Sequence, residues 1–145
     1  FSFYSAFYFR DQNLEGFLLI IIICVSTDIG GYIFGKLFKG PKLTKISPNK
    51  TYSGACGSFI SALIVGYLYY QIQNNLLSIN INIFIFIIFI SFMSQIGDLF
   101  ISFLKRKAKI KDTGSLLPGH GGILDRIDGM LLAIPIGLLL INVYS

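Results

Sequence analysis

The 145-residue sequence has few charged residues and few of the side chains that carry nucleophilic or zinc chemistry. It has no tryptophan, one histidine, two cysteines and seven acidic residues, and charged residues make up 13% of the chain. Soluble domains carry about 25% charged residues, so the composition argues against an ordinary soluble protein. Cys24 and Cys56 have no histidine near them. They predict neither a zinc site nor a disulfide framework, and we expect both to be packed, reduced thiols.

The sequence also lacks a Gly-x-x-x-x-Gly-Lys-Ser/Thr loop, and no serine or cysteine stands beside its histidine. These absences argue against a P-loop nucleotide hydrolase and against a histidine-activated nucleophile. The basic residues have no aromatic side chains among them on which bases could stack, so we expect no nucleic-acid partner. Attraction to anionic lipid headgroups is the simpler explanation for the run of cations at 105–111.

Long apolar runs dominate the rest of the chain, which is 54% hydrophobic with a mean hydropathy of +0.71. Four stretches approach the roughly 20 residues that a membrane-spanning helix needs. They cover residues 17–34, 54–70, 81–101 and 129–144. The sequence therefore predicts an all-α, polytopic transmembrane helical bundle of about four membrane helices, with residues 1–145 forming one membrane-embedded domain.

Positive charge is concentrated in two of the three predicted loops. The loop 36–52 carries five lysines and no acid, the loop 71–80 carries no charge, and the loop 102–128 carries six basic residues. Because loops rich in Lys and Arg stay on the cytoplasmic side, both polar loops are predicted to lie there. The expected location is a bacterial inner membrane, with the two polar loops facing the cytoplasm.

Asp28 and Asp98 lie inside predicted spans, towards their cytoplasmic ends. A carboxylate at that depth costs a few kcal/mol unless it is paired, neutralised or bound to a metal. One interpretation is an ion pair with Lys or Arg that holds helices together. The other is ligation of a cation near the membrane surface.

The stretch 102–128 contains six cations, three carboxylates, one histidine and four glycines. If a helix begins near Ile123, Asp125 and Asp128 lie on one face of it. They would be ordinary partners of the helix dipole, or, together with Asp98 and Asp28, a hard-metal site of oxygen ligands.

Two shorter segments complete the candidate site. The glycines around His120 permit backbone N–H groups to point at an anion, although a plain glycine-rich turn explains them equally simply. Lys50, in the segment Ser47-Pro48-Asn49-Lys50-Thr51, either contributes to phosphate binding or extends to the membrane surface.

These residues resemble the signature of phosphatidate cytidylyltransferases, also called CDP-diacylglycerol synthases. The matching positions are Ser102, Lys105, Arg106, Lys111, Asp112, Gly114, Pro118, His120, Gly121, Gly122, Asp125, Arg126 and Asp128. The segments 95–98, 28–36 and 47–51 resemble further family motifs, so the resemblance covers about residues 24–130. Ile29 follows Asp28 where the family often has Ser or Thr. The family usually has more than four membrane helices, so we expect this sequence to be the C-terminal part of a longer protein.

The resemblance implies transfer of a cytidylyl group from CTP to phosphatidic acid, giving CDP-diacylglycerol and pyrophosphate in phospholipid biosynthesis. It implies Mg²⁺ as cofactor, as two divalent or mixed cations, and membrane lipids as surroundings. The oligomeric state stays open, with a homodimer as one option. A related CTP-dependent lipid-alcohol kinase is the alternative enzyme, and an ion-coupled membrane transporter is the alternative of another class.

The resemblance also implies a role for each candidate residue. The expected metal ligands are Asp98, Asp125 and Asp28. The expected catalytic residues are Asp98, Asp125, Asp128, Lys111 and His120. The expected substrate-binding residues are Lys50, Ser102, Lys105, Arg106, Gly121, Gly122 and Arg126.

Overall fold

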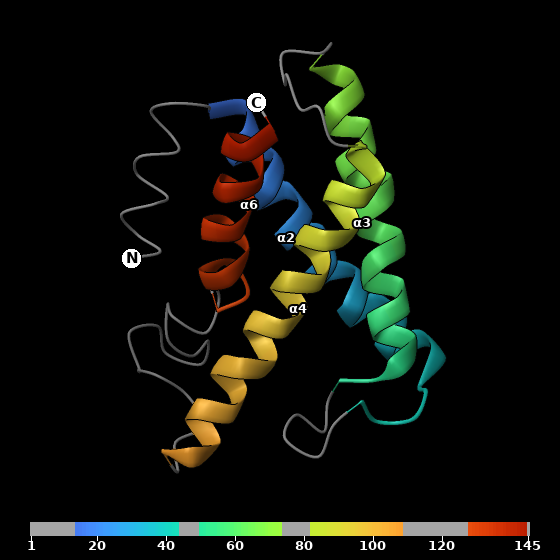
Figure 1. The fold of residues 1–145 in the computed structure, drawn as a ribbon. Helices are drawn as coiled ribbons and strands as arrows, with labels where there is room; N and C mark the ends of the chain where they lie inside the picture. The colour runs from blue at the N-terminus through green and yellow to red at the C-terminus, as the bar shows by residue number, and fades with distance from the viewer. Residues whose placement is uncertain (1–13, 44–49, 74–81, 109–127, 145) are drawn as a thin grey trace, which may run out of the picture.

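The structure, a computed structural model, describes residues 14–43, 50–73, 82–108 and 128–144. These residues form four helices, namely α2 (Leu14–Phe38), α3 (Tyr52–Ile72), α4 (Ile83–Lys107) and α6 (Met130–Tyr144). Successive helices run in opposite directions, with α2 crossing behind α4 (Figure 1). The described residues contain no strand, only an isolated bridge between Lys42 and Thr51. The predicted all-α bundle is confirmed.

Three of the helices are long and apolar enough to cross a membrane. Helices α2 and α4 have 25 residues each and α3 has 21. Helix α6 has 15 residues and contains Pro135, so it is about 22 Å long, against a hydrocarbon core of about 30 Å. The protein is an integral membrane protein, but its fourth predicted span is a shorter apolar helix.

Two helix ends differ from the sequence-based expectation. Helix α4 continues beyond residue 101 to Lys107, so the predicted polar loop begins inside a helix. Three cations in this last turn, including Lys107, favour the extension because they offset the negative end of the helix dipole. Asp128 was expected within a helix but forms a turn with Gly129 before α6 begins at Met130; the helix start expected near Ile123 lies outside the described residues.

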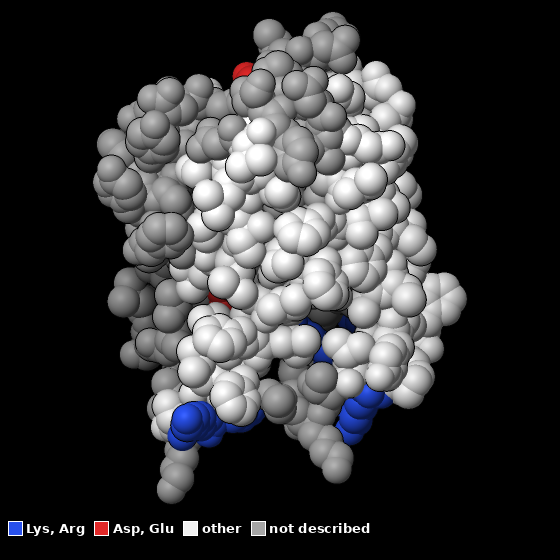
Figure 2. All heavy atoms as spheres, viewed as in Figure 1, with Lys and Arg blue, Asp and Glu red and all other residues white. Residues whose placement is uncertain are grey.

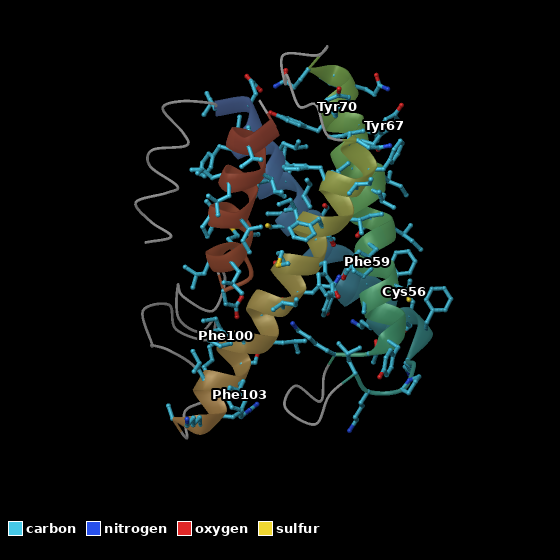
Figure 3. The ribbon with its side chains drawn as sticks, in the orientation of Figure 1. Cys56, Phe59, Tyr67, Tyr70, Phe100 and Phe103 are labelled. Atoms are coloured by element: carbon cyan, nitrogen blue, oxygen red, sulfur yellow. The ribbon has the colours of Figure 1, made fainter. Side chains whose placement is uncertain are left out.

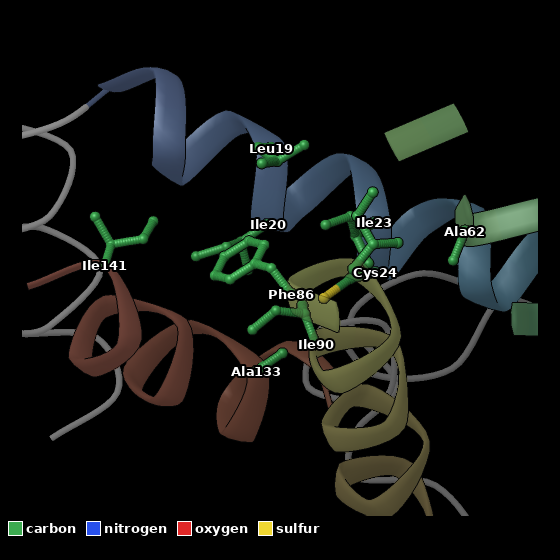
Figure 4. Packing of buried hydrophobic residues seen from close by; sticks show 10 residues of the cluster. Leu19, Ile20, Ile23, Cys24, Ala62, Phe86, Ile90, Ala133 and Ile141 are labelled. Carbon is green, nitrogen blue, oxygen red and sulfur yellow. The ribbon is translucent and has the colours of Figure 1, made fainter. Parts of the chain in front are cut away.

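The hydrophobic core lies where α2, α4 and α6 meet, with one residue from α3 (Figure 4). Phe86 and Ile90 of α4 pack there with Ile20 and Ile23 of α2. The fully buried set is Leu19, Ile20, Ile23, Cys24, Ala62, Phe86, Ile87, Ile90, Ala133 and Ile141. Many large apolar side chains elsewhere on α2, α3 and α4 are exposed, as expected of helices whose outer faces contact lipid.

Helices α2 and α3 approach closely because small residues face each other. A Cβ on Gly57 would lie 2.3 Å from the Cβ of Phe34, and one on Gly54 would lie 2.8 Å from the carbonyl oxygen of Gly31. The Ser61 hydroxyl donates to the carbonyl oxygen of Ser26 at 2.8 Å. Small residues and hydroxyl bonds of this kind are how membrane helices associate without a hydrophobic driving force between them. The interface fixes α2, and with it Asp28, against α3.

The two cysteines differ in environment. Cys24 is buried in the core, as expected, whereas Cys56 is exposed on the outer side of α3 (Figure 3). The prediction of two packed thiols is therefore wrong for Cys56. Its neighbour Gly57 faces α2 and is buried, so the close contact between the two helices turns Cys56 outwards.

Candidate active site

A pocket of about 480 Å³ lies between α2, the start of α3 and α4. It is at the end of the bundle where Lys and Arg side chains gather (Figure 2). Its charged lining residues come from separate segments of the chain and are Asp28, Lys50, Asp98 and Asp128. The structure thus brings together three of the four acids singled out in the sequence; the fourth, Asp125, is outside the described residues.

Asp28 is held by a hydrogen-bonded stretch of α2. The preceding residue, Thr27, is buried, and its hydroxyl lies 2.9 Å from that of Ser91 on α4. The hydroxyl of Ser58 on α3 donates to the carbonyl oxygen of Thr27 at 2.8 Å. These bonds from two neighbouring helices fix the backbone beside Asp28, whose side chain is exposed and lines the pocket.

Lys50 is positioned by a short antiparallel pairing that precedes α3. The Leu43 N–H donates to the Lys50 carbonyl oxygen at 2.7 Å, and the Tyr52 N–H donates to the Pro41 carbonyl oxygen at 3.1 Å. Thr51 then caps α3, its hydroxyl accepting from the Gly54 N–H at 3.1 Å. The Lys50 ammonium reaches across the pocket to Asp98 Oδ2 at 3.0 Å. Because its backbone is held on both sides, only the Lys50 side chain needs to move to change partner.

Asp98 and Asp128 lie side by side although they are 30 positions apart in the sequence. The Gly129 N–H donates to Asp128 Oδ1 at 3.0 Å, and a Cβ on Gly129 would lie 2.8 Å from Asp98 Oδ1. Burial raises the pKa of the Asp128 carboxyl to about 6, and hydrogen bonding to Asp98 and the charge of Asp98 act in the same direction. The two groups therefore form a close pair of like charges, which is unfavourable without a cation.

Lys105 supplies one such cation. Its ammonium lies 3.5 Å from Asp128 Oδ2, and the two side chains are only 12% and 16% exposed. Ser102, one turn earlier on α4, lines the pocket. Arg106 is exposed at the end of α4 and is not among the lining residues. Lys50 and Ser102 thus line the pocket, and Lys105 reaches it through Asp128, whereas Arg106 lies outside it; the roles predicted for these residues stay predictions.

Six predicted site residues lie outside the described residues. They are Lys111, His120, Gly121, Gly122, Asp125 and Arg126. Their predicted roles, and the predicted glycine-rich anion seat, stay predictions.

The carboxylate oxygens in the pocket suit a hard cation that is also coordinated by a bound ligand. Within the described ranges, no three His, Cys, Asp or Glu side chains are grouped closely enough to hold a metal ion by themselves. Mg²⁺, however, is usually held by one or two carboxylates together with substrate phosphates. Asp98 and Asp128 supply such a pair, and both line a pocket with room for phosphate groups. Asp28 lines the same pocket without joining a tight three-acid cluster.

Reasoning from the sequence alone gave Gln95 no role of its own. Gln95 lines the pocket, and its Nε2 atom is buried without a hydrogen-bond partner in the described structure. It stands three positions before Asp98 on α4, a spacing that puts two side chains on the same helix face. That spacing was the signal that could have identified it.

Comparison with known proteins agrees with this geometry. The model of the cytidylyltransferase family matches residues 1–144, nearly the whole chain. The chain belongs to this family. Its similarity extends to a phosphatidate cytidylyltransferase of Rickettsia typhi, 42% identical over 141 residues, or 93% of this chain and 61% of that protein.

Other bacteria carry similar proteins. A phosphatidate cytidylyltransferase of Bacillus subtilis is 39% identical over 140 residues, which is 94% of this chain and 52% of that protein. One of Haemophilus influenzae is 39% identical over 122 residues, which is 81% of this chain and 42% of that protein. This cytidylyltransferase-family chain therefore spans about two fifths to three fifths of the length of these relatives.

Proposed function

We propose that this chain carries the active site of a phosphatidate cytidylyltransferase, which transfers a cytidylyl group from CTP to phosphatidic acid and releases pyrophosphate. One observation carries the proposal. Carboxylates from α2, α4 and the turn before α6 meet a lysine from the α2–α3 connection in one pocket, near the ends of three helices able to cross a membrane. Membership of the cytidylyltransferase family supports the same reaction.

The chemistry fits the charges in the pocket. A phosphate oxygen of phosphatidic acid attacks the α-phosphorus of CTP in line, the new P–O bond forms, and the bond to the β-phosphate breaks to release pyrophosphate. The attacking oxygen is already anionic, so no strong general base is required. Catalysis then rests on positioning and charge neutralisation. Lys50 and Lys105 hold phosphate oxygens.

We propose Mg²⁺ as the cofactor, held by Asp98 and Asp128, with Asp28 in support and Asp125 as a further ligand. When bound there, it supplies positive charge for the phosphate oxygens of the attacking and leaving groups. The carboxylates of Asp98 and Asp128 would orient the Mg²⁺ ion, and its positive charge would offset the repulsion between them. The pair of lysines is then available to the substrates.

The proposed location of the pocket is the cytoplasmic side of a bacterial inner membrane. Lysines gather at the end of α2, namely Lys36, Lys39 and Lys42. Three cations lie in the last turn of α4, at the same end of the bundle (Figure 2). Such a one-sided distribution is typical of the cytoplasmic face. CTP would then reach the pocket from the cytoplasm and phosphatidic acid from the membrane.

The test is to incubate the intact membrane protein, in vesicles that contain phosphatidic acid, with CTP labelled at the α-phosphate. We expect Mg²⁺-dependent labelling of the lipid as CDP-diacylglycerol, with unlabelled pyrophosphate released. Asp98→Asn should reduce this labelling by at least about a hundredfold while the protein still inserts. Glu15→Gln is the matched control, because Glu15 bonds Tyr69 near the opposite end of the bundle.

The products separate the alternatives. A CTP-dependent lipid-alcohol kinase would release CDP and leave the α-phosphate on the nucleotide. Near-normal CDP-diacylglycerol formation by Asp98→Asn would reject the role given to Asp98. Ion-dependent solute uptake without nucleotide turnover would instead favour a transporter. The mass of the solubilised protein tests whether it forms a homodimer.

A further inference from the structure

Lys50 and the proposed divalent cation both require Asp98. The Lys50 ammonium lies 3.0 Å from Asp98 Oδ2, and the two side chains are 32% and 18% exposed. Both side chains keep some contact with solvent, which screens the ion pair, so a dication can compete with the ammonium for the carboxylate. A dication at the Asp98 carboxylate would occupy the position in which the ammonium now lies.

The surroundings limit where a displaced ammonium can go. The Lys50 backbone is fixed by the pairing with Leu43 and by the start of α3. Two other carboxylates line the pocket, Asp28 and Asp128, and the second already has Lys105 at 3.5 Å. Lys50 itself lines the pocket. Once displaced from Asp98, it would therefore be within reach of an anion that enters this space.

From these contacts we propose that Lys50 is a positioning residue that exchanges partners. It neutralises Asp98 while the pocket is empty, and it moves to a substrate phosphate when a divalent cation takes its place. The proposal deepens the function proposed above and rests on it. The cation and the phosphate ligand then favour each other's binding. The cation alone leaves the Lys50 ammonium without a partner, and the phosphate alone has to compete with Asp98 for that ammonium. Such coupling is reciprocal and commonly amounts to 5- to 150-fold in affinity.

The first test measures Mn²⁺ binding by electron paramagnetic resonance on the purified membrane protein without nucleotide. Lys50→Met removes the competitor, so it should bind Mn²⁺ at least about fivefold more tightly than the wild type. Lys50→Arg keeps the charge and should behave like the wild type. Lys42→Met is the matched control, because Lys42 lies in the segment paired with Thr51 but is exposed and outside the pocket lining.

The second test follows the ammonium directly by acylation and mass spectrometry. Mg²⁺ without nucleotide should raise the labelling of Lys50 in the wild type, and CTP added with Mg²⁺ should lower it again, while Lys42 labelling stays constant. A cation held elsewhere in the pocket would leave Lys50 labelling unchanged in both steps.

Equal or weaker Mn²⁺ binding by Lys50→Met, or labelling of Lys50 that does not respond to Mg²⁺, would overturn the exchange. If the wild type still forms CDP-diacylglycerol in those circumstances, the exchange alone is rejected. If the wild type forms no CDP-diacylglycerol, the proposed function is rejected, and the exchange that rests on it is rejected too.

Discussion

Gly97 of α4 lies directly against the turn that carries Asp128. A Cβ at position 97 would be 3.0 Å from the carbonyl oxygens of both Asp128 and Gly129. The obstruction is backbone, which cannot rotate away as a flexible side chain does. The distance between the Asp98 and Asp128 carboxylates therefore depends on a residue that carries no functional group.

Gly97→Ala is expected to lower activity about tenfold, because pushing the turn away misplaces Asp128 relative to Asp98. Labelled-CTP turnover and Mn²⁺ binding measure the effect. Gly66→Ala is the control, since a Cβ there would lie 3.2 Å from side-chain atoms of Ile23 and Ile87, which can adjust. Equal effects of the two substitutions would argue against a special role for the Gly97 contact.

Binding of a divalent cation should weaken as the pH falls through about 6. The Asp128 carboxyl has its pKa raised to about 6 by burial and by Asp98, and only its ionised form is a good metal ligand. Protons therefore compete with the metal below that pH, and the carboxylate is mostly ionised at pH 7. Mn²⁺ titrations between pH 5 and 8 check this. Asp128→Asn should bind less Mn²⁺ and lose most of the pH dependence in this range.

Lys105→Met should impair activity more than Lys107→Met. Lys105 is nearly buried against Asp128, whereas Lys107, two positions later on the same helix, is exposed. Loss of Lys105 leaves the pair of carboxylates without one of its cations and removes a phosphate-binding group, so we expect at least a tenfold fall in kcat/KM for CTP. Similar losses in both variants would indicate a general effect of charge at the end of α4.

Gly57→Leu should destabilise the protein, and Cys56→Leu should not. A Cβ at position 57 would overlap Phe34 of α2, while Cys56 points outwards from the same helix (Figure 3). Overpacking of such a contact costs about 1–3 kcal/mol, which should lower the melting temperature by roughly 5 °C or more in detergent. Thermal unfolding followed by circular dichroism provides the comparison. A tolerated leucine at position 57 would show that the close approach of α2 and α3 is not required.

The helices were predictable because apolar runs of membrane length have few other interpretations. The ends of the helices were less predictable. Lys105 and Lys107 were read as loop residues because they are charged, yet charges of this sign stabilise a helix C-terminus. The break at Asp128 and Gly129 was missed for a tertiary reason: the turn is shaped by its contact with Gly97, which sequence spacing cannot reveal.

That Asp28 and Asp98 line one pocket was anticipated from their similar depth in the membrane. The lysine partners of Asp98 and Asp128 were not assigned, because Lys50 and Lys105 are each one of several cations in a polar segment and the choice among them depends on three-dimensional distance. The pairing of residues 41–43 with 50–52, which selects Lys50, has no clear pattern in the sequence. The resemblance to cytidylyltransferases named Lys50, Asp98, Lys105 and Asp128 without showing which of them touch.

The ion pair between Lys50 and Asp98 joins two halves of the chain. Asp28 and Lys50 belong to the part that ends with α3, and Asp98 and Asp128 belong to the part that begins with α4. Neither part alone contains a complete set of charged groups. If the gene were split between α3 and α4 and both pieces were produced in one cell, turnover would report their reassembly, and each piece by itself would be inert.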